Sequence, residues 1–249
     1  MIEATGIDDW DDHWSRFGSA AEIGPTPRYR RRLIFGELNL PATPRARVVE
    51  FGSGTGEFGE ALLEAYPEAH FTGLEYSRTG VEISRNRVPS ATFQQCDLLQ
   101  PVNDSDLPRE LATHAVCSEV LEHLDDPVLF LRNATRFMAT GCLLVATVPG
   151  GPFTEFYRVI GHRKHYTPKE LSDVFERAGL KVERSYAAGF PFFNLFRLGV
   201  LLRGSRLAND VSGPPGAAIR IASRIFDILL PLSLKRWGWQ TVVVARRPA

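Results

Sequence analysis

The chain has 249 residues, and its 29 basic side chains are balanced by 29 acidic ones, so no net charge draws it to nucleic acid. Its three cysteines form no C-x-x-C pair, which favours reduced, buried thiols. The acidic N-terminus lacks the features of a signal peptide, and no apolar run reaches the roughly 18 residues of a membrane span, so we expect a cytoplasmic protein.

Residues 1–44 precede the first predicted strand, and we interpret them as a helical arm or cap. Aromatic side chains between residues 10 and 17 predict a helix, and arginines at 28 and 30–32 follow it. These arginines could bind an anionic group, but a charge run is more often a solvated helix face, which is the expectation here. Tyr29, inside this run, is a candidate for covering a bound ligand.

The most informative stretch is 48–59, which reads Val-Val-Glu-Phe-Gly-Ser-Gly-Thr-Gly-Glu-Phe-Gly. It predicts a strand near 46–51, a glycine loop and a helix near 57–66. Glycines at alternate positions remove side chains where the backbone turns sharply and approaches a ligand. Gly54, Gly56 and Gly59 also satisfy the dinucleotide template G-x-G-x-x-G, with an acid about 20 residues further on, so the pattern alone leaves two ligand classes open.

Glu50 stands before the first glycine, where a carboxylate suits the cationic methionine end of S-adenosylmethionine (SAM). With that acid, the string from Glu50 to Gly56 resembles the first motif of the class I SAM-dependent methyltransferases. The resemblance covers about residues 45–188 and the final strand. It implies a Rossmann-like α/β fold, with a seven-stranded and mostly parallel sheet whose last strand is antiparallel. In many relatives an N-terminal arm folds over the cofactor.

Two later strands also end in acids, near 69–74 and near 91–95. Ligands of open α/β sheets bind at the carboxyl ends of the strands. By the resemblance, Glu75 accepts hydrogen bonds from both ribose hydroxyls, and Asp97 accepts one from the adenine amino group. The predicted cofactor-binding residues are Glu50, Gly52, Ser53, Gly54, Gly56, Glu75, Tyr76, Cys96, Asp97, Leu98 and Glu119.

A predicted strand at 114–118 breaks into a polar corner before a helix expected at 127–139. In this corner the string from Glu119 to His123 is similar to ubiquinone-type O-methyltransferases and small-RNA 2′-O-methyltransferases, in which matching residues can hold a divalent metal. Glu119, Glu122 and His123 are therefore candidate catalytic residues and candidate ligands of Mg²⁺, Mn²⁺ or Zn²⁺. In the metal-free alternative His123 is the general base. A purely structural role for Glu122 and His123, bracing the following helix, is also open.

After a strand at 142–148, the string from Gly161 to Pro168 is similar to a segment of bacterial methyltransferases. His162 and His165 in this string are candidates for catalysis or for binding an anionic acceptor. The alternative is a basic loop that hydrogen-bonds its own backbone. Thr167 and Glu170 have the spacing of a capping box, which predicts a helix over 168–178.

Strands at 181–187 and 239–245 complete the predicted sheet, and 189–237 between them is an insertion. Apolar helical stretches within it indicate a lid or packing element, with a dimer contact or a membrane-surface helix as alternatives. The expected organisation is an arm at 1–44, a SAM-binding core at 45–188, a helical lid at 189–237, and a last strand and tail at 238–249.

The sequence therefore predicts a SAM-dependent methyltransferase, acting by O-methylation on a small, lipophilic or aromatic acceptor. N-methylation stays open, because an amine can use the same pocket. The alternatives from other classes are an NAD-dependent oxidoreductase and a SAM-binding protein without catalysis. We expect a monomer or homodimer that contacts its small-molecule acceptor, or a lipid-like surface, rather than nucleic acid.

Overall fold

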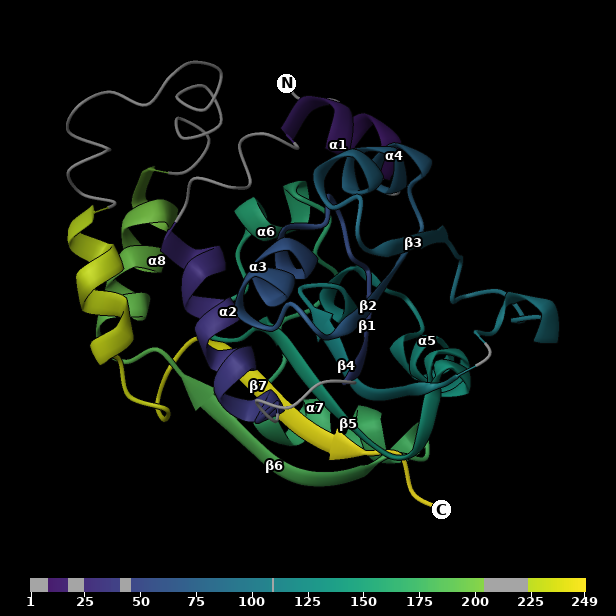
Figure 1. Cartoon of the computed structure of the whole chain (residues 1–249). Helices are drawn as coiled ribbons and strands as arrows, with labels where there is room; N and C mark the ends of the chain where they lie inside the picture. Colours follow the sequence, from purple (N-terminus) through teal and green to yellow (C-terminus); the bar gives the residue numbers. More distant parts are fainter. Residues whose placement is uncertain (1–8, 18–24, 41–45, 109, 204–223) are drawn as a thin grey trace.

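The structure of the protein is a computed structural model that describes residues 9–17, 25–40, 46–108, 110–203 and 224–249. Its centre is a seven-stranded sheet with helices on both faces (Figure 1). In spatial order the strands are β3 (Thr92–Gln95), β2 (His70–Glu75), β1 (Arg47–Phe51), β4 (Ala112–Ser118), β5 (Met138–Pro149), β7 (Gln240–Arg246) and β6 (Lys181–Ala188). The predicted fold class is confirmed.

The strands β3, β2, β1, β4 and β5 are parallel to one another. Strand β7 runs antiparallel to both of its neighbours, β5 and β6. From β1 the chain builds outward to β2 and β3, and it then returns to the other side of β1 to form β4 and β5. This reversal lies between β1 and β4, and open α/β sheets bind ligands in the crevice at such a point. The topology therefore places a binding site at the carboxyl ends of β1 and β4.

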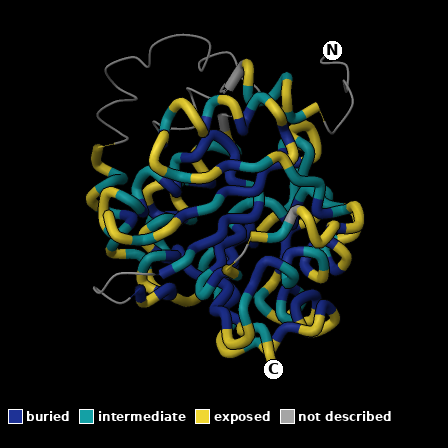
Figure 2. The backbone as a smooth tube through the Cα atoms, turned by 45° about the vertical axis from the view of Figure 1, so that its right-hand side comes forward, coloured by how far each residue is buried: buried dark blue, intermediate teal, exposed yellow. Residues whose placement is uncertain are grey.

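Both faces of the sheet are covered because its strands alternate apolar side chains toward two helical layers. On one face Val48, Val116 and Val145 share a buried cluster with side chains of α2 (Pro25–Leu38), α3 (Glu57–Ala65) and α4 (Arg78–Arg87). On the other face Phe51 and Leu144 share a cluster with α5 (Pro127–Ala134) and α7 (Pro168–Arg177). The central strands are accordingly the most deeply buried part of the backbone (Figure 2).

Helix boundaries follow local capping chemistry. The capping box predicted at Thr167 and Glu170 is present and starts α7. The Asp126 side chain accepts from the backbone of Leu129 and starts α5, with Pro127 in the first turn. The helix expected at 127–139 is too long, however: α5 ends at Ala134, a 3₁₀ turn covers Thr135–Phe137, and β5 begins at Met138. Buried apolar residues such as Met138 suit a core helix and a core strand equally, so the pattern could not locate this end.

The N-terminal arm contains α1 (Trp10–Phe17) and α2. The Asp11 carboxylate accepts from the backbone N–H of Thr79 and from the Ser77 hydroxyl, which ties α1 to the start of α4. Tyr29 of α2 is buried, and its ring lies 5.0 Å from that of Phe193. Tyr29 therefore packs against the insertion. Two cavities open at the carboxyl ends of the strands, and Tyr29 lines neither of them. The prediction that Tyr29 covers a bound ligand is therefore wrong.

Within the described residues, the insertion between β6 and β7 contributes α8 (Phe192–Arg203) and a helical segment at 224–229. The two helices meet through Phe196 and Phe226, and Asp227 forms an ion pair with Arg28 of α2. Residues 204–223 of the predicted lid lie outside the described residues. Ile225 and Ile228 are exposed rather than packed. Among the described residues, no helix is long and apolar enough to cross a membrane.

Candidate functional site

Two adjoining cavities open at the carboxyl ends of the parallel strands. The first, of about 250 Å³, lies over the ends of β2 and β3, and the second, of about 390 Å³, lies between the glycine loop and α2. Five residues line both cavities, namely Trp10, Trp14, Gly52, Glu119 and His123. The two cavities therefore meet where the predicted cofactor residues and the predicted catalytic residues come together.

The glycine loop brings the backbone close to both cavities. Gly52 has a φ of +74°, and a Cβ at this position would overlap the Val120 side chain. A Cβ on Gly54 would lie 3.0 Å from the Trp14 ring, so α1 packs directly on the loop. Gly56 lines neither cavity and packs on Ser84 and Phe93. Gly52 and Gly54 thus line the cavities, where their predicted approach to a ligand stays a prediction, whereas Gly56 packs inside the fold.

Gly59, which completed the dinucleotide template, packs against the sheet, as the third glycine of that template also does. It lies on α3, and an added Cβ would overlap the Phe71 ring on β2. Helix-to-sheet packing alone therefore accounts for this glycine.

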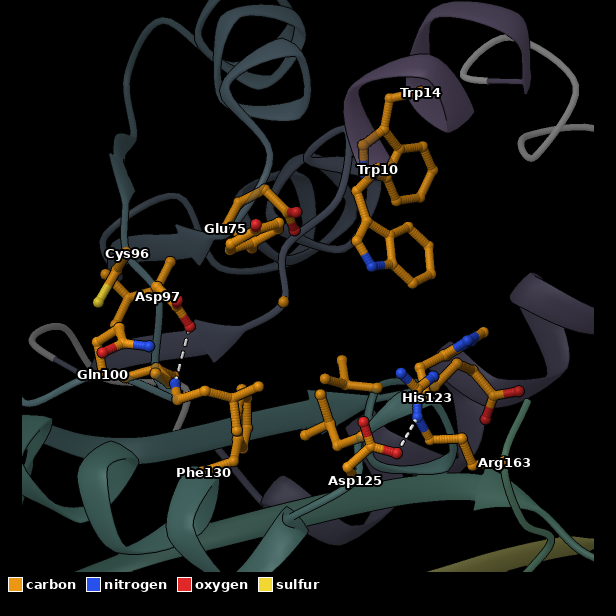
Figure 3. A pocket seen from close by; sticks show the side chains of 18 residues that line it. Trp10, Trp14, Glu75, Cys96, Asp97, Gln100, His123, Asp125, Phe130 and Arg163 are labelled. Carbon is orange, nitrogen blue, oxygen red and sulfur yellow. Dashed lines mark hydrogen bonds and ion pairs between the residues drawn. The ribbon is translucent and has the colours of Figure 1, made fainter. Parts of the chain in front are cut away.

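The first cavity contains the acids predicted to bind adenosine. The two carboxylate oxygens of Glu75 accept from the backbone N–H groups of Gly54, at 2.8 Å, and Ser77, at 2.9 Å. Asp97 accepts from the N–H of Leu99 at 2.9 Å. Tyr76, Cys96 and Leu98 line the same cavity. Backbone amides therefore fix both carboxylates at its wall, where a carboxylate oxygen can accept from more than one donor (Figure 3).

Glu50 lies in the second cavity with Ser53. Both side chains are buried, and among the described residues neither Glu50 Oε2 nor Ser53 Oγ has a hydrogen-bond partner. Burial, and then the nearby charge of Glu75, raises the pKa of Glu50 well above its usual range. A buried carboxylate without a partner is costly, whereas a cationic group beside it would offset that cost. The residues present therefore fit SAM, whose methionine end carries an ammonium group.

Glu119 stands between the two cavities in an unusual conformation. Its φ is +58°, in the left-handed region that a non-glycine residue rarely adopts. One oxygen of its carboxylate accepts from Gln240 Nε2 at 2.8 Å, and the other lies 3.5 Å from Arg30 Nη1. The strained backbone thus directs this acid at the junction of the cavities.

His123 stands on the same junction, and its orientation is fixed. Its Nδ1 lies 3.2 Å from the carbonyl oxygen of Gly161, and its ring meets Trp10 edge to face. A carbonyl oxygen can only accept a hydrogen bond, so Nδ1 carries the proton in the neutral ring and the lone pair is on Nε2. Figure 3 shows Trp10 and His123 together at the wall of the first cavity.

Glu122 and two further histidines lie near His123. Ligand atoms of Glu122, His123 and His162 all lie within 4.8 Å of one another, and Glu119 is not part of this group. Burial, followed by the charge of Glu119, raises the pKa of Glu122 well above its usual range. Both of its carboxylate oxygens lack hydrogen-bond partners among the described residues. The candidate metal ligands in the structure are thus one carboxylate and two imidazoles. His162 takes the position in this set that the sequence analysis gave to Glu119.

His165 lies behind this group and lines neither cavity. Its Nε2 is 3.2 Å from Nδ1 of His162. Burial lowers the pKa of His162 to about 2 and that of His165 to about 4, so both rings are neutral near pH 7. Only His162 of these two lies within reach of a ligand in the second cavity.

Several cavity residues, including residues of the N-terminal arm, were not among the predicted site residues. Trp10 and Trp14 of α1 close over both cavities, and Arg30 and Arg31 of α2 line the second. The prediction of a solvated arginine face is wrong for these two arginines, although the neighbouring Arg32 is exposed as predicted. An i, i+4 pair of tryptophans on a short acidic helix was the signal that could have identified the aromatic cover.

The comparisons with known proteins agree with this geometry. Residues 27–185 match a family model described as a methyltransferase domain. The chain is 34% identical over 106 residues to trans-aconitate 2-methyltransferase from Methylobacterium nodulans, covering 43% of this chain and 40% of that one. It is 26% identical over 145 residues to a ubiquinone/menaquinone biosynthesis C-methyltransferase from Desulfotalea psychrophila, covering 54% and 56% respectively. The matches therefore span about half, or less, of these curated relatives.

A solved structure extends the comparison to nearly the whole chain. Phosphoethanolamine N-methyltransferase 2 of Haemonchus contortus, in complex with SAM, superposes with a TM-score of 0.63 at 12% identity. The superposition covers 98% of this chain and 61% of that one. At this identity the likeness concerns the fold alone.

Proposed function

Because the chain belongs to the methyltransferase-domain family, we propose that it transfers the methyl group of SAM to an oxygen atom of a small acceptor. The observation that carries the proposal is the junction of two cavities at Glu119 and His123. One cavity has the acids that suit adenosine, and the other has space for an acceptor beside the glycine loop. Membership of this family also favours SAM over a dinucleotide as the ligand of the glycine loop, which the glycine template alone left open.

The residues around the first cavity have separate tasks in this proposal. Glu75 and Asp97 bind the ribose and the adenine, while Glu50 and Ser53 hold the methionine end from the second cavity. When bound, SAM supplies a methyl group on a sulfonium, which an acceptor oxygen can displace in line. Holding the reacting atoms collinear can contribute much of the roughly 7–11 kcal/mol that orientation offers. Trp10 and Trp14 exclude water from the junction.

His123 is the base in this proposal. Its Nδ1–H is engaged by the Gly161 carbonyl, so Nε2, which lies 4.0 Å from Glu122 Oε1, is the atom that would take a proton from an acceptor hydroxyl. A general base of this kind typically contributes a factor of about 10² to 10⁴ in rate. The second cavity also has an apolar wall, made by Ile34, Phe58 and Ile160, which supports a lipophilic or aromatic acceptor body.

A divalent ion is the alternative to this base. Glu122, His123 and His162 would hold it, and the ion would lower the pKa of a bound hydroxyl. Because His123 Nδ1 is bonded to Gly161, Nε2 would be its ligand atom, so His123 cannot be both a ligand and the base. Thermal unfolding with Mg²⁺, Mn²⁺ or Zn²⁺ against EDTA decides between the two. A rise in melting temperature that Glu122→Gln abolishes supports the metal, and no rise supports the base.

The proposed reaction is tested by incubating the protein with methyl-labelled SAM and a panel of hydroxy acids, phenols, carboxylic acids and amines. We expect label in an oxygen compound together with equimolar S-adenosylhomocysteine. Treatment with base separates the product classes, because methyl esters release methanol whereas ethers, N-methyl and C-methyl products do not. Label confined to amines would contradict O-methylation and favour the N-methyltransferase alternative.

A further inference from the structure

Two adjacent arginines of α2 reach different sides of the second cavity. Arg31 Nη1 donates to the backbone carbonyl of Glu57 at 3.3 Å, at the end of the glycine loop. Its charge acts against the rise in the pKa of both Glu50 and Glu57. Arg31 therefore lies on the side of the cavity that suits the methionine end of SAM, where the carboxylate of that ligand needs a cation.

Arg30 reaches the opposite side, where the methyl group would be transferred. Its guanidinium faces Glu119, and its side chain is 22% exposed. Its positive charge lowers the pKa of Glu122 and of His162. It also lowers the pKa of Glu57, by less than Arg31 does. The two neighbouring cations are thus divided between the cofactor side and the acceptor side of one cavity.

The contact between Arg30 and Glu119 is loose. The separation of 3.5 Å exceeds the 2.7–2.9 Å that is usual for a charge-assisted N–H···O bond. Glu119 has other partners on its second oxygen, since Gln240 Nε2 donates at 2.8 Å and Thr147 Oγ1 lies at 3.4 Å. Glu119 would therefore remain hydrogen-bonded if Arg30 turned to a ligand. A ligand carboxylate can offer the guanidinium two parallel bonds, which is a stronger arrangement than this single contact.

We propose that Arg30 binds a carboxylate of the methyl acceptor, which makes the acceptor an organic acid with a second oxygen group at His123. This inference rests on the proposed function, and it names the substrate class. The methylated oxygen belongs to that second group, because a carboxylate held by a guanidinium has its charge compensated and is a poor nucleophile. Hydroxy acids and polycarboxylic acids meet this requirement, and the apolar wall formed by Ile34 and Ile160 accommodates the body of the molecule.

The test compares benzoate with benzamide, a neutral molecule of the same shape, and adds trans-aconitate as a polycarboxylic acid. Protein saturated with S-adenosylhomocysteine is titrated in a calorimeter with benzoate, trans-aconitate and benzamide. We expect at least one acid to bind about tenfold or more tightly than benzamide, the size of one charge-assisted hydrogen bond. Arg30→Gln should remove this preference, and Arg30→Lys should retain part of it. Arg31→Gln should weaken S-adenosylhomocysteine instead, and the exposed control Arg32→Gln should change neither affinity.

The proposal is overturned if neither acid binds more tightly than benzamide, or if Arg30→Gln keeps the preference while its melting temperature is unchanged. These results would leave the proposed function intact, provided that S-adenosylhomocysteine still binds. If S-adenosylhomocysteine itself fails to bind, the proposed function falls, and this inference falls with it.

Discussion

Replacing Glu50 with glutamine should change cofactor affinity and the stability of the free protein in opposite directions. The side chain is buried, and Oε2 has no hydrogen-bond partner among the described residues. Burial raises the pKa of Glu50 above its usual 4.5, so a proton bound there in the folded state is released on unfolding. The destabilisation is therefore absent below about pH 4.5 and grows as the pH rises above that value.

The expected changes in affinity and in stability both follow from the environment of the Glu50 side chain. Loss of a charge-assisted hydrogen bond to the SAM ammonium costs about 1.5–3 kcal/mol, which is roughly a 10- to 150-fold weaker Kd. Replacing this buried carboxyl group, whose proton uptake on folding costs free energy above about pH 4.5, should stabilise the free protein by about 1 kcal/mol, because an unsatisfied amide remains. For a chain of this size that corresponds to a melting temperature about 2–4 °C higher.

Two measurements on one protein preparation test this reasoning. Calorimetry with S-adenosylhomocysteine gives the affinity, and thermal unfolding without ligand at pH 5 and pH 8 gives the stability. The exposed Glu64 of α3 supplies the matched control, since Glu64→Gln removes a charge from the same region without touching either cavity. A Glu50→Gln protein that is less stable at pH 8 and binds the ligand normally would refute the assigned role of Glu50.

Three further changes separate catalysis, binding and folding. His123→Asn should reduce turnover by about 10²- to 10⁴-fold with nearly unchanged S-adenosylhomocysteine affinity, and equal losses of both would make His123 structural. Gly52→Ala should abolish calorimetric binding, since its φ of +74° costs about 1–2 kcal/mol for alanine and the new Cβ overlaps Val120. Thr167→Ala should lower the free energy of unfolding by about 1 kcal/mol through the lost cap of α7, and any loss of ligand affinity would contradict its purely structural role.

Much of the fold could be predicted from the sequence because the signals are local. Alternation of buried strands and amphipathic helices specifies a parallel α/β sheet, and the capping box at Thr167 specifies where α7 begins. The end of α5 was missed because Phe137 and Met138 are fully buried, and full burial removes the periodicity that distinguishes a helix from a strand.

The position of a candidate residue in space could be predicted best where that residue belongs to a strand end. Glu50 and Glu75 lie at the ends of β1 and β2, Asp97 lies just after β3, and parallel strands bring their carboxyl ends to one edge. Arg30 and Trp10 come from a separate arm, and their position depends on how α1 and α2 dock on the sheet. No local pattern encodes that docking. For the same reason His162, from a distant loop, joined Glu122 and His123 in place of Glu119.

Calorimetric titration of the protein with SAM, S-adenosylhomocysteine and NAD⁺ tests the central claim most directly. We predict saturable one-to-one binding of SAM and of S-adenosylhomocysteine, and no binding of NAD⁺. Binding of NAD⁺ alone, or of none of the three, would contradict the assignment of both cavities to methyl transfer.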